Sequence, residues 1–490
     1  MLPDDVLLKI FDFYVNEELC EDYKPVKERR MQEWITLVHV CRRWRNVVFY
    51  SPRRLNLRLV CTPKTLVRDT LDTWPPFPLI VRSGYWNDTS SVAPDNTIAA
   101  LEHNDRVCQI NLSYLSLTST KLEIFTTSAA MQKPFLELTD LRLVTFRFGW
   151  EPILPDSFLG GTAPRLRLLD LHGVPFPGLP KLLLSATQLV HLSLSAVPFS
   201  GYIPPEVMAT TLSTLTSLEK LCFHFLYLQP RHALQSRRPP PPPLPLTRSI
   251  LPRLTKVIFK GASEYLEEIL SRVDAPRLEE LHITFFDQII SDSDLPQLFQ
   301  FIGRRPTLRA PEKGYIAFTV YAIVVKFPSR TSDFDALIVE IPSTESEEWP
   351  LSSLAQLCTS SLPPVSTLED LYIFEGRMDP PRWQNNVENT LWQEILHSFA
   401  AAKNLHLYKE SVPRIAAVLQ ELVEGRATEV FPTLENIFLE GYQLSGPLHE
   451  GIEKFVAARR LTSHPVAVSH WDKDRESKQE EEKQWRIYGL

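Results

Sequence analysis

A short apolar pattern recurs along most of this 490-residue chain and limits the folds available to it. The pattern is Leu-x-x-Leu-x-Leu, in which other apolar residues can replace leucine, and it occurs nine times. The copies begin at Val107, Leu138, Leu166, Leu189, Leu218, Leu254, Leu278, Leu368 and Leu434. Each copy puts alternate apolar side chains on one face of a short strand. Helical periodicity after several copies predicts helices over residues 204–215, 263–272, 387–403 and 412–424.

One strand and one helix cannot bury their apolar faces alone, so units of this kind stack on their neighbours. We therefore predict an α/β fold: an irregular leucine-rich-repeat solenoid over residues 107–462, with a parallel sheet on its inner curve and helices outside. The copies from Val107 to Leu278 begin between 23 and 36 residues apart. Regular repeats place asparagine or cysteine after the pattern, whereas this chain has Leu115, Phe146, Val174, Val197, Leu226 and Phe286. An asparagine ladder is therefore not expected.

Three segments depart from the repeat. Residues 229–247 contain five consecutive prolines and predict an exposed loop in polyproline II conformation, which either binds an SH3 or WW-type module or acts as a spacer. Residues 315–341 hold two apolar runs too close together for a helix between them, which predicts a hairpin. Residues 463–490 are polar and predict a disordered tail, and residues 61–106 are expected to connect the N-terminus to the repeats.

The first sixty residues predict a small helical module. A helix is expected from Pro3 to Tyr14, because proline suits the first turn, two aspartates follow it, and apolar residues recur at helical spacing. A second helical pattern runs from Met31 to Tyr50 and is apolar on two sides. Such a helix must be covered from two sides, and a module of this size supplies one cover at most. The other cover comes from the following domain or from another protein.

The motifs Leu2-Pro3-Asp4-Asp5-Val6-Leu7-Leu8, Val38-His39-Val40-Cys41-Arg42-Arg43-Trp44-Arg45 and Ser51-Pro52 resemble an F-box of the form found in many fungal proteins. The resemblance implies that residues 1–60 dock on a Skp-type adaptor, which bridges to a cullin scaffold and a ubiquitin-conjugating enzyme. The motif positions that would contact the adaptor are Leu2, Pro3, Val6, Leu7, Ile10, Val40, Cys41 and Trp44. The linker from Asn16 to Glu33 is longer than in a compact F-box. The alternative is a helical cap that closes the solenoid.

Together, the two regions predict the substrate-recognition subunit of an SCF-type cullin ubiquitin ligase. Polar residues between the repeated leucines are the candidates for binding an unknown protein target: Asp140, Arg142, Asp170, His191, Lys220, Lys256, Glu280, His282, Tyr372 and His406. Both charge signs are present, which favours a protein or peptide over a polyanion. The alternative of a different class is a leucine-rich-repeat interaction scaffold with no ligase role.

Enzymatic chemistry is not expected. The chain has no glycine-rich phosphate loop, GxSxG elbow, HExxH pair or paired-cysteine metal site, so we predict no catalytic residue, cofactor or metal. The nearest constellation is Cys222-x-His224, with His191 and His282 on other repeats. Two strand-borne residues without an orienting partner are usually ordinary surface groups.

Composition narrows the class of partner. The net charge of −7 favours neither nucleic acid nor an anionic membrane, and the sequence lacks an apolar run of about 20 residues that could span a bilayer. Six cysteines without paired spacing argue against a disulfide framework and for a reducing compartment. The acidic start of the chain does not resemble a signal peptide. We therefore expect an intracellular protein of the cytoplasm, the nucleus or both.

Overall fold

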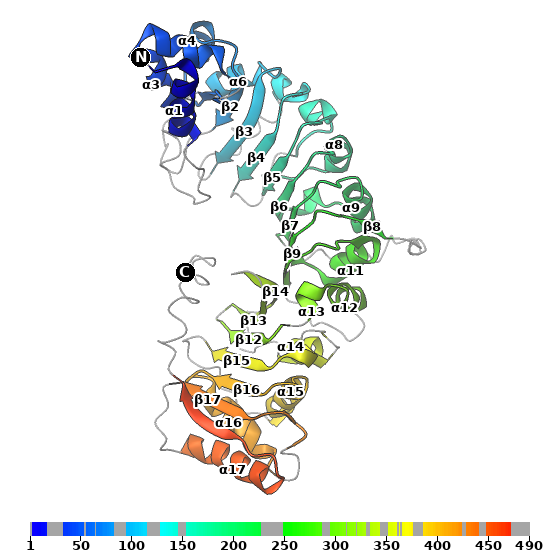
Figure 1. The fold of residues 1–490 in the computed structure, drawn as a ribbon. Coiled ribbons are helices and arrows are strands. Elements are labelled where there is room, and N and C mark those ends of the chain that lie inside the picture. The colour runs from blue at the N-terminus through cyan, green and yellow to red at the C-terminus, as the bar shows by residue number, and fades with distance from the viewer. Residues whose placement is uncertain are drawn as a thin grey trace. The chain divides into compact units, whose positions relative to one another are not determined.

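The fold was analysed in a computed structural model of the chain (Figure 1). It describes residues 2–16, 33–52, 55–63, 65–82, 95–114, 128–145, 153–226, 248–286, 295–309, 311–319, 321–329, 334–343, 351–359, 362, 365–375, 386–423, 428–440 and 447–471. The chain divides into two compact units, Met1–Leu226 and Tyr227–Leu490. The boundary lies next to the proline-rich segment 229–247, which is itself outside the described residues.

Within its described residues, the first unit begins with three helices and continues as a parallel sheet. The helices are α1 (Asp4–Asn16), α3 (Glu33–Val40) and α4 (Arg42–Tyr50). The strands are β1 (Leu59–Cys61), β2 (Leu79–Arg82), β3 (Val107–Tyr114), β4 (Asp140–Thr145), β5 (Leu168–His172), β6 (His191–Val197) and β7 (Lys220–Phe225). Each strand pairs in parallel with the next one in sequence. The connections contain α5 (Val67–Thr73), α6 (Asp95–Leu101), η1 (Ala129–Gln132), η2 (Phe158–Gly161), α8 (Leu179–Ser185), η3 (Phe199–Gly201) and α9 (Pro205–Leu212).

The repeated apolar positions form the core of this sheet. Strand β4 alternates half-buried and buried residues, and its Leu141 and Leu143 are inaccessible to solvent. The five copies of the pattern in this unit coincide with β3 to β7, as predicted. Strands β1 and β2 were not predicted. Strand β1 lies at the start of the segment expected to be a connection and β2 lies inside it, and periodicity alone does not distinguish so short an apolar run from a buried helix turn.

Two threonine hydroxyls link segments that are about 30 residues apart in the sequence. Thr139 Oγ1 donates to the main-chain oxygen of Cys108 at 3.0 Å, in the preceding repeat. Thr307 Oγ1 donates to Leu278 O at 2.9 Å in the same way. Each bond gives a main-chain carbonyl at or just before the start of a strand a side-chain donor.

The second unit also contains a mostly parallel sheet, whose strand order is β9-β11-β14-β13-β12-β15-β16-β17-β18. The strands are β9 (Lys256–Gly261), β11 (Glu280–Phe285), β12 (Lys313–Phe318), β13 (Ala322–Pro328), β14 (Asp335–Pro342), β15 (Asp370–Glu375), β16 (Asn404–Leu407), β17 (Asn436–Glu440) and β18 (Ala467–Trp471). A separate parallel pair joins β8 (Ser249–Ile250) to β10 (Val273–Asp274). The helices are α11 (Ser263–Arg272), α12 (Pro296–Gly303), α13 (Pro306–Arg309), α14 (Leu351–Thr359), η4 (Val365–Thr367), α15 (Asn386–His397), α16 (Val412–Glu421) and α17 (Pro447–Leu461). The chain is thus a mixed α/β protein whose strands are mostly parallel.

The predicted hairpin at 315–341 is a three-stranded meander. Strand β13 runs antiparallel to both β12 and β14, whereas β14 pairs in parallel with β11 and β12 with β15. The apolar run that begins at Ile316 contains two strands, because a turn at Thr319 splits it, with Thr319 N donating to Ala322 O at 2.9 Å. The meander therefore continues the sheet with two antiparallel steps inside it.

The C-terminal prediction needs a correction. Strand β18 lies inside the segment expected to be a disordered tail and pairs in parallel with β17 over five residues. Main-chain hydrogen bonds stabilise a strand of any composition, so its polar side chains gave no signal. Residues 472–490 lie outside the described residues, as do residues 17–32 of the interhelical linker.

Candidate docking site on the N-terminal helices

Helix α1 packs one side against α4 and leaves the other side open. Leu7 and Phe11, four residues apart, are buried on its inner side. The Phe11 ring lies 4.7 Å from that of Trp44, which is half-buried. Ile10 and Phe13 point elsewhere and are 47% and 72% exposed. The inner residues therefore hold the helices together, and the outer ones remain accessible.

The second helical pattern is two helices, which corrects the prediction of one helix over 31–50. The break is at Cys41, whose backbone is extended, with φ −160° and ψ 168°. Its sulfur accepts a hydrogen bond from Trp44 N at 3.4 Å and so caps the first turn of α4. Cysteine is not a usual N-cap residue, so the sequence gave no warning of this break.

The segment that leads into the sheet covers one side of α3. It is one of the two covers that the sequence predicts for this helical pattern. Trp34 is 1% exposed, and its ring lies 5.3 Å from Trp74 and 5.4 Å from Phe77, both in edge-to-face geometry. Its indole Nε1 donates to Arg58 O at 3.1 Å. The N-terminal helices are thus anchored to the segment that enters the sheet.

Exposed apolar side chains are concentrated on these helices. In the part of the chain that the structure describes, six of the sixteen large apolar side chains with the greatest exposure lie between residues 2 and 50. They are Leu2, Ile10, Phe13, Tyr14, Val40 and Tyr50. Val40 is 58% exposed and Tyr50 86%. Among the described residues, large exposed apolar side chains are therefore denser in this segment than in the rest of the chain.

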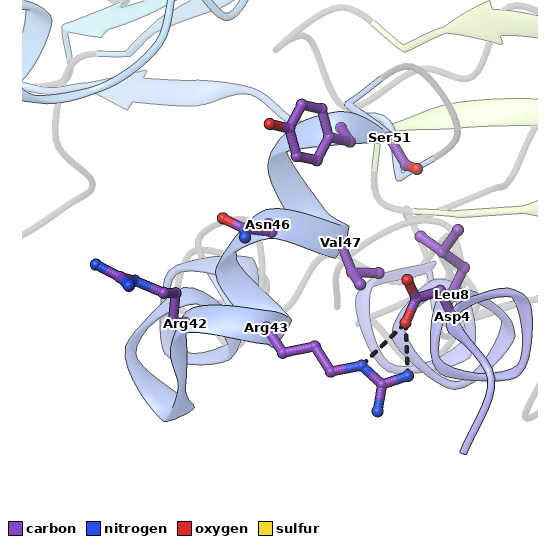
Figure 2. Close-up of a pocket in the computed structure, with 8 residues that line it drawn as sticks. Asp4, Leu8, Arg42, Arg43, Asn46, Val47 and Ser51 are labelled. Atoms are coloured by element: carbon purple, nitrogen blue, oxygen red, sulfur yellow. Dashed lines mark hydrogen bonds and ion pairs between the residues drawn. The ribbon is translucent and has the colours of Figure 1, made fainter. Parts of the chain in front are cut away.

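A depression of about 620 Å³ lies between α1 and α4 (Figure 2). Its lining residues are Asp4, Leu8, Arg42, Arg43, Asn46, Val47, Tyr50 and Ser51. Arg43 reaches across it to Asp4, with Nε and Nη2 at 3.0 and 2.6 Å from Oδ1, and Nη2 also donates to Leu2 O. This exposed pair contributes little to stability, yet it fixes the start of α1. In Figure 2, Arg42 extends away from the pair and leaves a cationic group at the rim.

The predicted adaptor-contacting residues therefore fall into three groups by their burial. Leu2, Pro3, Ile10, Val40 and Cys41 are exposed, and Val6 and Trp44 are half-buried. Leu7 is 5% exposed and packs inside the module. Sequence reasoning did not single out Phe13 and Tyr50, although their bulk beside charged neighbours was a usable signal.

The predicted target-binding residues of the first unit lie on adjacent strands. Arg142 and Asp170 are paired in register, and His191 is in register with Lys220. Burial lowers the pKa of His191; the charge of Asp170 raises it, and those of Lys220 and Arg142 lower it further. Asp140 accepts from Gln109 Nε2 at 3.0 Å and Thr139 Oγ1 at 2.6 Å.

In the second unit, each predicted target-binding residue contacts another side chain on a neighbouring strand. Lys256 Nζ lies 2.5 Å from Glu280 Oε2, and His282 Nε2 lies 3.2 Å from Glu340 Oε1. Tyr372 and His406 stack with their ring centroids 4.1 Å apart and are 6% and 7% exposed. The prediction expected both rings on an open face, so their burial is a correction, and its cause is the packing of neighbouring rings on the same face.

The Cys222–His224 constellation does form a contact, with Sγ and Nε2 3.6 Å apart. Ser195 Oγ lies 3.8 Å from the same sulfur. No group of three or more His, Cys, Asp or Glu side chains suited to a metal ion occurs within the described ranges. None of the helices that the structure describes combines the length and hydropathy required to cross a bilayer.

The chain matches no protein-family model, and a search of curated proteins finds no similar sequence.

Proposed function

We propose that this chain is the substrate-recognition subunit of an SCF-type cullin ubiquitin ligase. Its N-terminal helices bind a Skp-type adaptor, and through it a cullin scaffold, while its repeat region binds a target protein. The chain itself does no chemistry: it brings the target close to a conjugating enzyme held elsewhere in the complex, and proximity supplies the rate. It acts inside the cell, in the cytoplasm, the nucleus or both.

The observation that carries the proposal is the exposure of apolar side chains at the positions of the F-box-like motif. Leu2, just before α1, and Ile10 and Val40, on α1 and α3, are each about half exposed, whereas other sides of these helices are buried. An amphipathic helical surface of this kind is covered by a partner that offers a complementary groove. Tyr50 and Arg42 extend the surface across α4, so a partner with an acidic rim fits best.

The repeat region is proposed to be an irregular leucine-rich-repeat solenoid. Successive strands pair in parallel in sequence order, and helical segments connect them, which is the arrangement that stacked repeats require. Its polar positions between the leucines are then available to a target protein.

Co-purification of the full-length chain with its Skp-type adaptor tests the proposal. The double variant Ile10→Asp with Val40→Asp puts two charges on the proposed contact surface without touching the module's core. Phe199→Asp is the matched control, since Phe199 is 62% exposed in the same unit but outside the N-terminal helices. We expect the unmodified chain and the control to retain the adaptor and the double variant to bind at least about tenfold more weakly.

Equal adaptor binding by the double variant would place the contact elsewhere. If no adaptor binds the folded, unmodified chain, the ligase role is lost, and the chain is an interaction scaffold whose N-terminal helices cap the repeats.

A further inference from the structure

Four stacked rings cross the sheet of the second unit. Tyr315, Tyr372, His406 and Phe438 occupy β12, β15, β16 and β17 in one register row, called here the aromatic row. Successive ring centroids are 4.6, 4.1 and 4.5 Å apart, with interplanar angles of 14°, 12° and 11°. The rings stack face to face, so each covers the π face of the next, and the neighbouring row on the same face, Asp370, Asn404 and Asn436, is a polar ladder.

A fifth ring lies over the row instead of in it. Trp471 ends strand β18 and is in register with Glu440, on the adjacent β17. Its indole nevertheless lies 5.3 Å from the ring of His406 and 5.8 Å from that of Tyr372, and meets Tyr408 at 5.0 Å and 90°. The side chain therefore reaches across one strand to cover rings on the next two.

Strand β18 contributes little else to the core. Ala467, Ser469 and His470 are exposed, and Val468 is half-buried, whereas the adjacent β17 buries Ile437 and Leu439. Main-chain pairing with β17, which is independent of sequence, and the contacts of the indole with the aromatic row both hold β18. It is also the last strand of the described sheet.

We infer that the aromatic row and the edge of β17, together the β17 site, bind the target, and that β18 is a resident occupant that the target displaces. This inference rests on the proposed function and names the class of target. The target offers an extended segment that pairs in parallel with β17 and carries an aromatic side chain where Trp471 lies. Strand addition gives affinity through main-chain bonds, and the ring gives selectivity, since aromatic rings favour the edge-to-face contacts that Trp471 makes.

Strand β18 raises the affinity that a target needs in order to bind the β17 site. Because β18 belongs to the same chain, it competes at a high effective concentration, and a segment without an aromatic ring does not displace it. The residues before the ring contribute little burial, since Ala467, Ser469 and His470 are exposed and Val468 is half-buried.

Hydrogen exchange of the full-length chain tests this inference. The probes are a peptide that copies Pro465–Trp471 and the same peptide with alanine at its tryptophan. They are added to the unmodified chain, to Trp471→Ala and to the matched control His470→Ala, which changes an exposed side chain of the same strand. In Trp471→Ala, we expect exchange of β18 amides to be at least about tenfold faster, because three ring contacts are lost. The tryptophan peptide should restore slow exchange at residues 436–440 of this variant, the alanine peptide should not, and His470→Ala should behave as unmodified.

Three results would overturn the inference. They are unchanged exchange in Trp471→Ala, equal protection by the two peptides, and fast exchange that spreads through β15 and α17, which would make Trp471 a core residue. Trp471→Phe retains a smaller ring and should fall between the unmodified chain and Trp471→Ala. Adaptor binding is read separately at the N-terminal helices, so failure of the β17 site with adaptor binding intact leaves the ligase role standing.

Discussion

Replacing Trp34 with alanine should loosen the attachment of the N-terminal helices to the sheet. A tryptophan side chain buries up to about 250 Å², and truncation to alanine removes about 200 Å² of that from the core. At about 25 cal/mol per Å², the loss is about 5 kcal/mol. Residual compactness of the unfolded chain lowers it by about 10–40%, to about 3–4.5 kcal/mol. This matches the usual cost of truncating a buried aromatic residue.

Trp44→Ala is the matched comparison, because Trp44 is only half-buried and pairs with one ring, that of Phe11. We expect it to cost about 1–2 kcal/mol. Urea-dependent hydrogen exchange in residues 33–52 and 65–82 reads the opening of this region directly, and peptides from the second unit serve as an internal control. A cost for Trp34→Ala below about 1 kcal/mol, or equal costs for both variants, would refute the anchoring of α3 by the ring cluster.

Two further predictions concern buried charges of the second unit. Arg459 is 0% exposed and donates to the main-chain oxygen of Leu434 at 3.2 Å. Arg459→Leu should therefore lower the free energy of unfolding of the unit by about 2–4 kcal/mol, as measured by urea denaturation. Arg460→Leu, at the exposed neighbouring residue, should change it by no more than about 0.5 kcal/mol. Burial raises the pKa of the Glu340 carboxyl, but hydrogen bonds from His282 and Thr284 and the positive charges of His282 and Lys326 outweigh it and hold the pKa below its ordinary value. The stabilisation by the ionised carboxylate is therefore fully present above the ordinary pKa and is lost as the pH falls through the lowered one. Thermal unfolding of Glu340→Gln should therefore change less between pH 5 and pH 3 than that of the unmodified chain, and an unchanged pH dependence would contradict the assignment.

The sequence predicted the strands wherever the core imposes alternation. Each of the nine copies of the apolar pattern coincides with a strand. Leu141 and Leu143 of β4 show the reason, because alternate leucines have only one buried face to occupy. Strands held by main-chain pairing escaped prediction. Ser469 and His470 in β18 carry no apolar signal, and parallel pairing with β17 needs none.

The sites were predictable only in part, because their geometry depends on contacts between distant residues. The pattern placed Tyr372 and His406 correctly on one face, but their burial depends on Trp471, whose approach no local periodicity encodes. Likewise, the motif positions named Ile10 and Val40, which are exposed, together with Leu7, which packs inward. Motif position alone does not show which side of a short helix faces a partner and which side packs inside the module.

The most direct test of the central claim is a calorimetric titration of the purified full-length chain with the Skp-type adaptor of the organism that encodes it. The account predicts a one-to-one complex with a Kd of about 1 μM or tighter, corresponding to about −8 kcal/mol, and binding at least about tenfold weaker for Ile10→Asp with Val40→Asp. A folded chain that gives no binding heat at any temperature tested, or a double variant that binds as tightly as the unmodified chain, would contradict it.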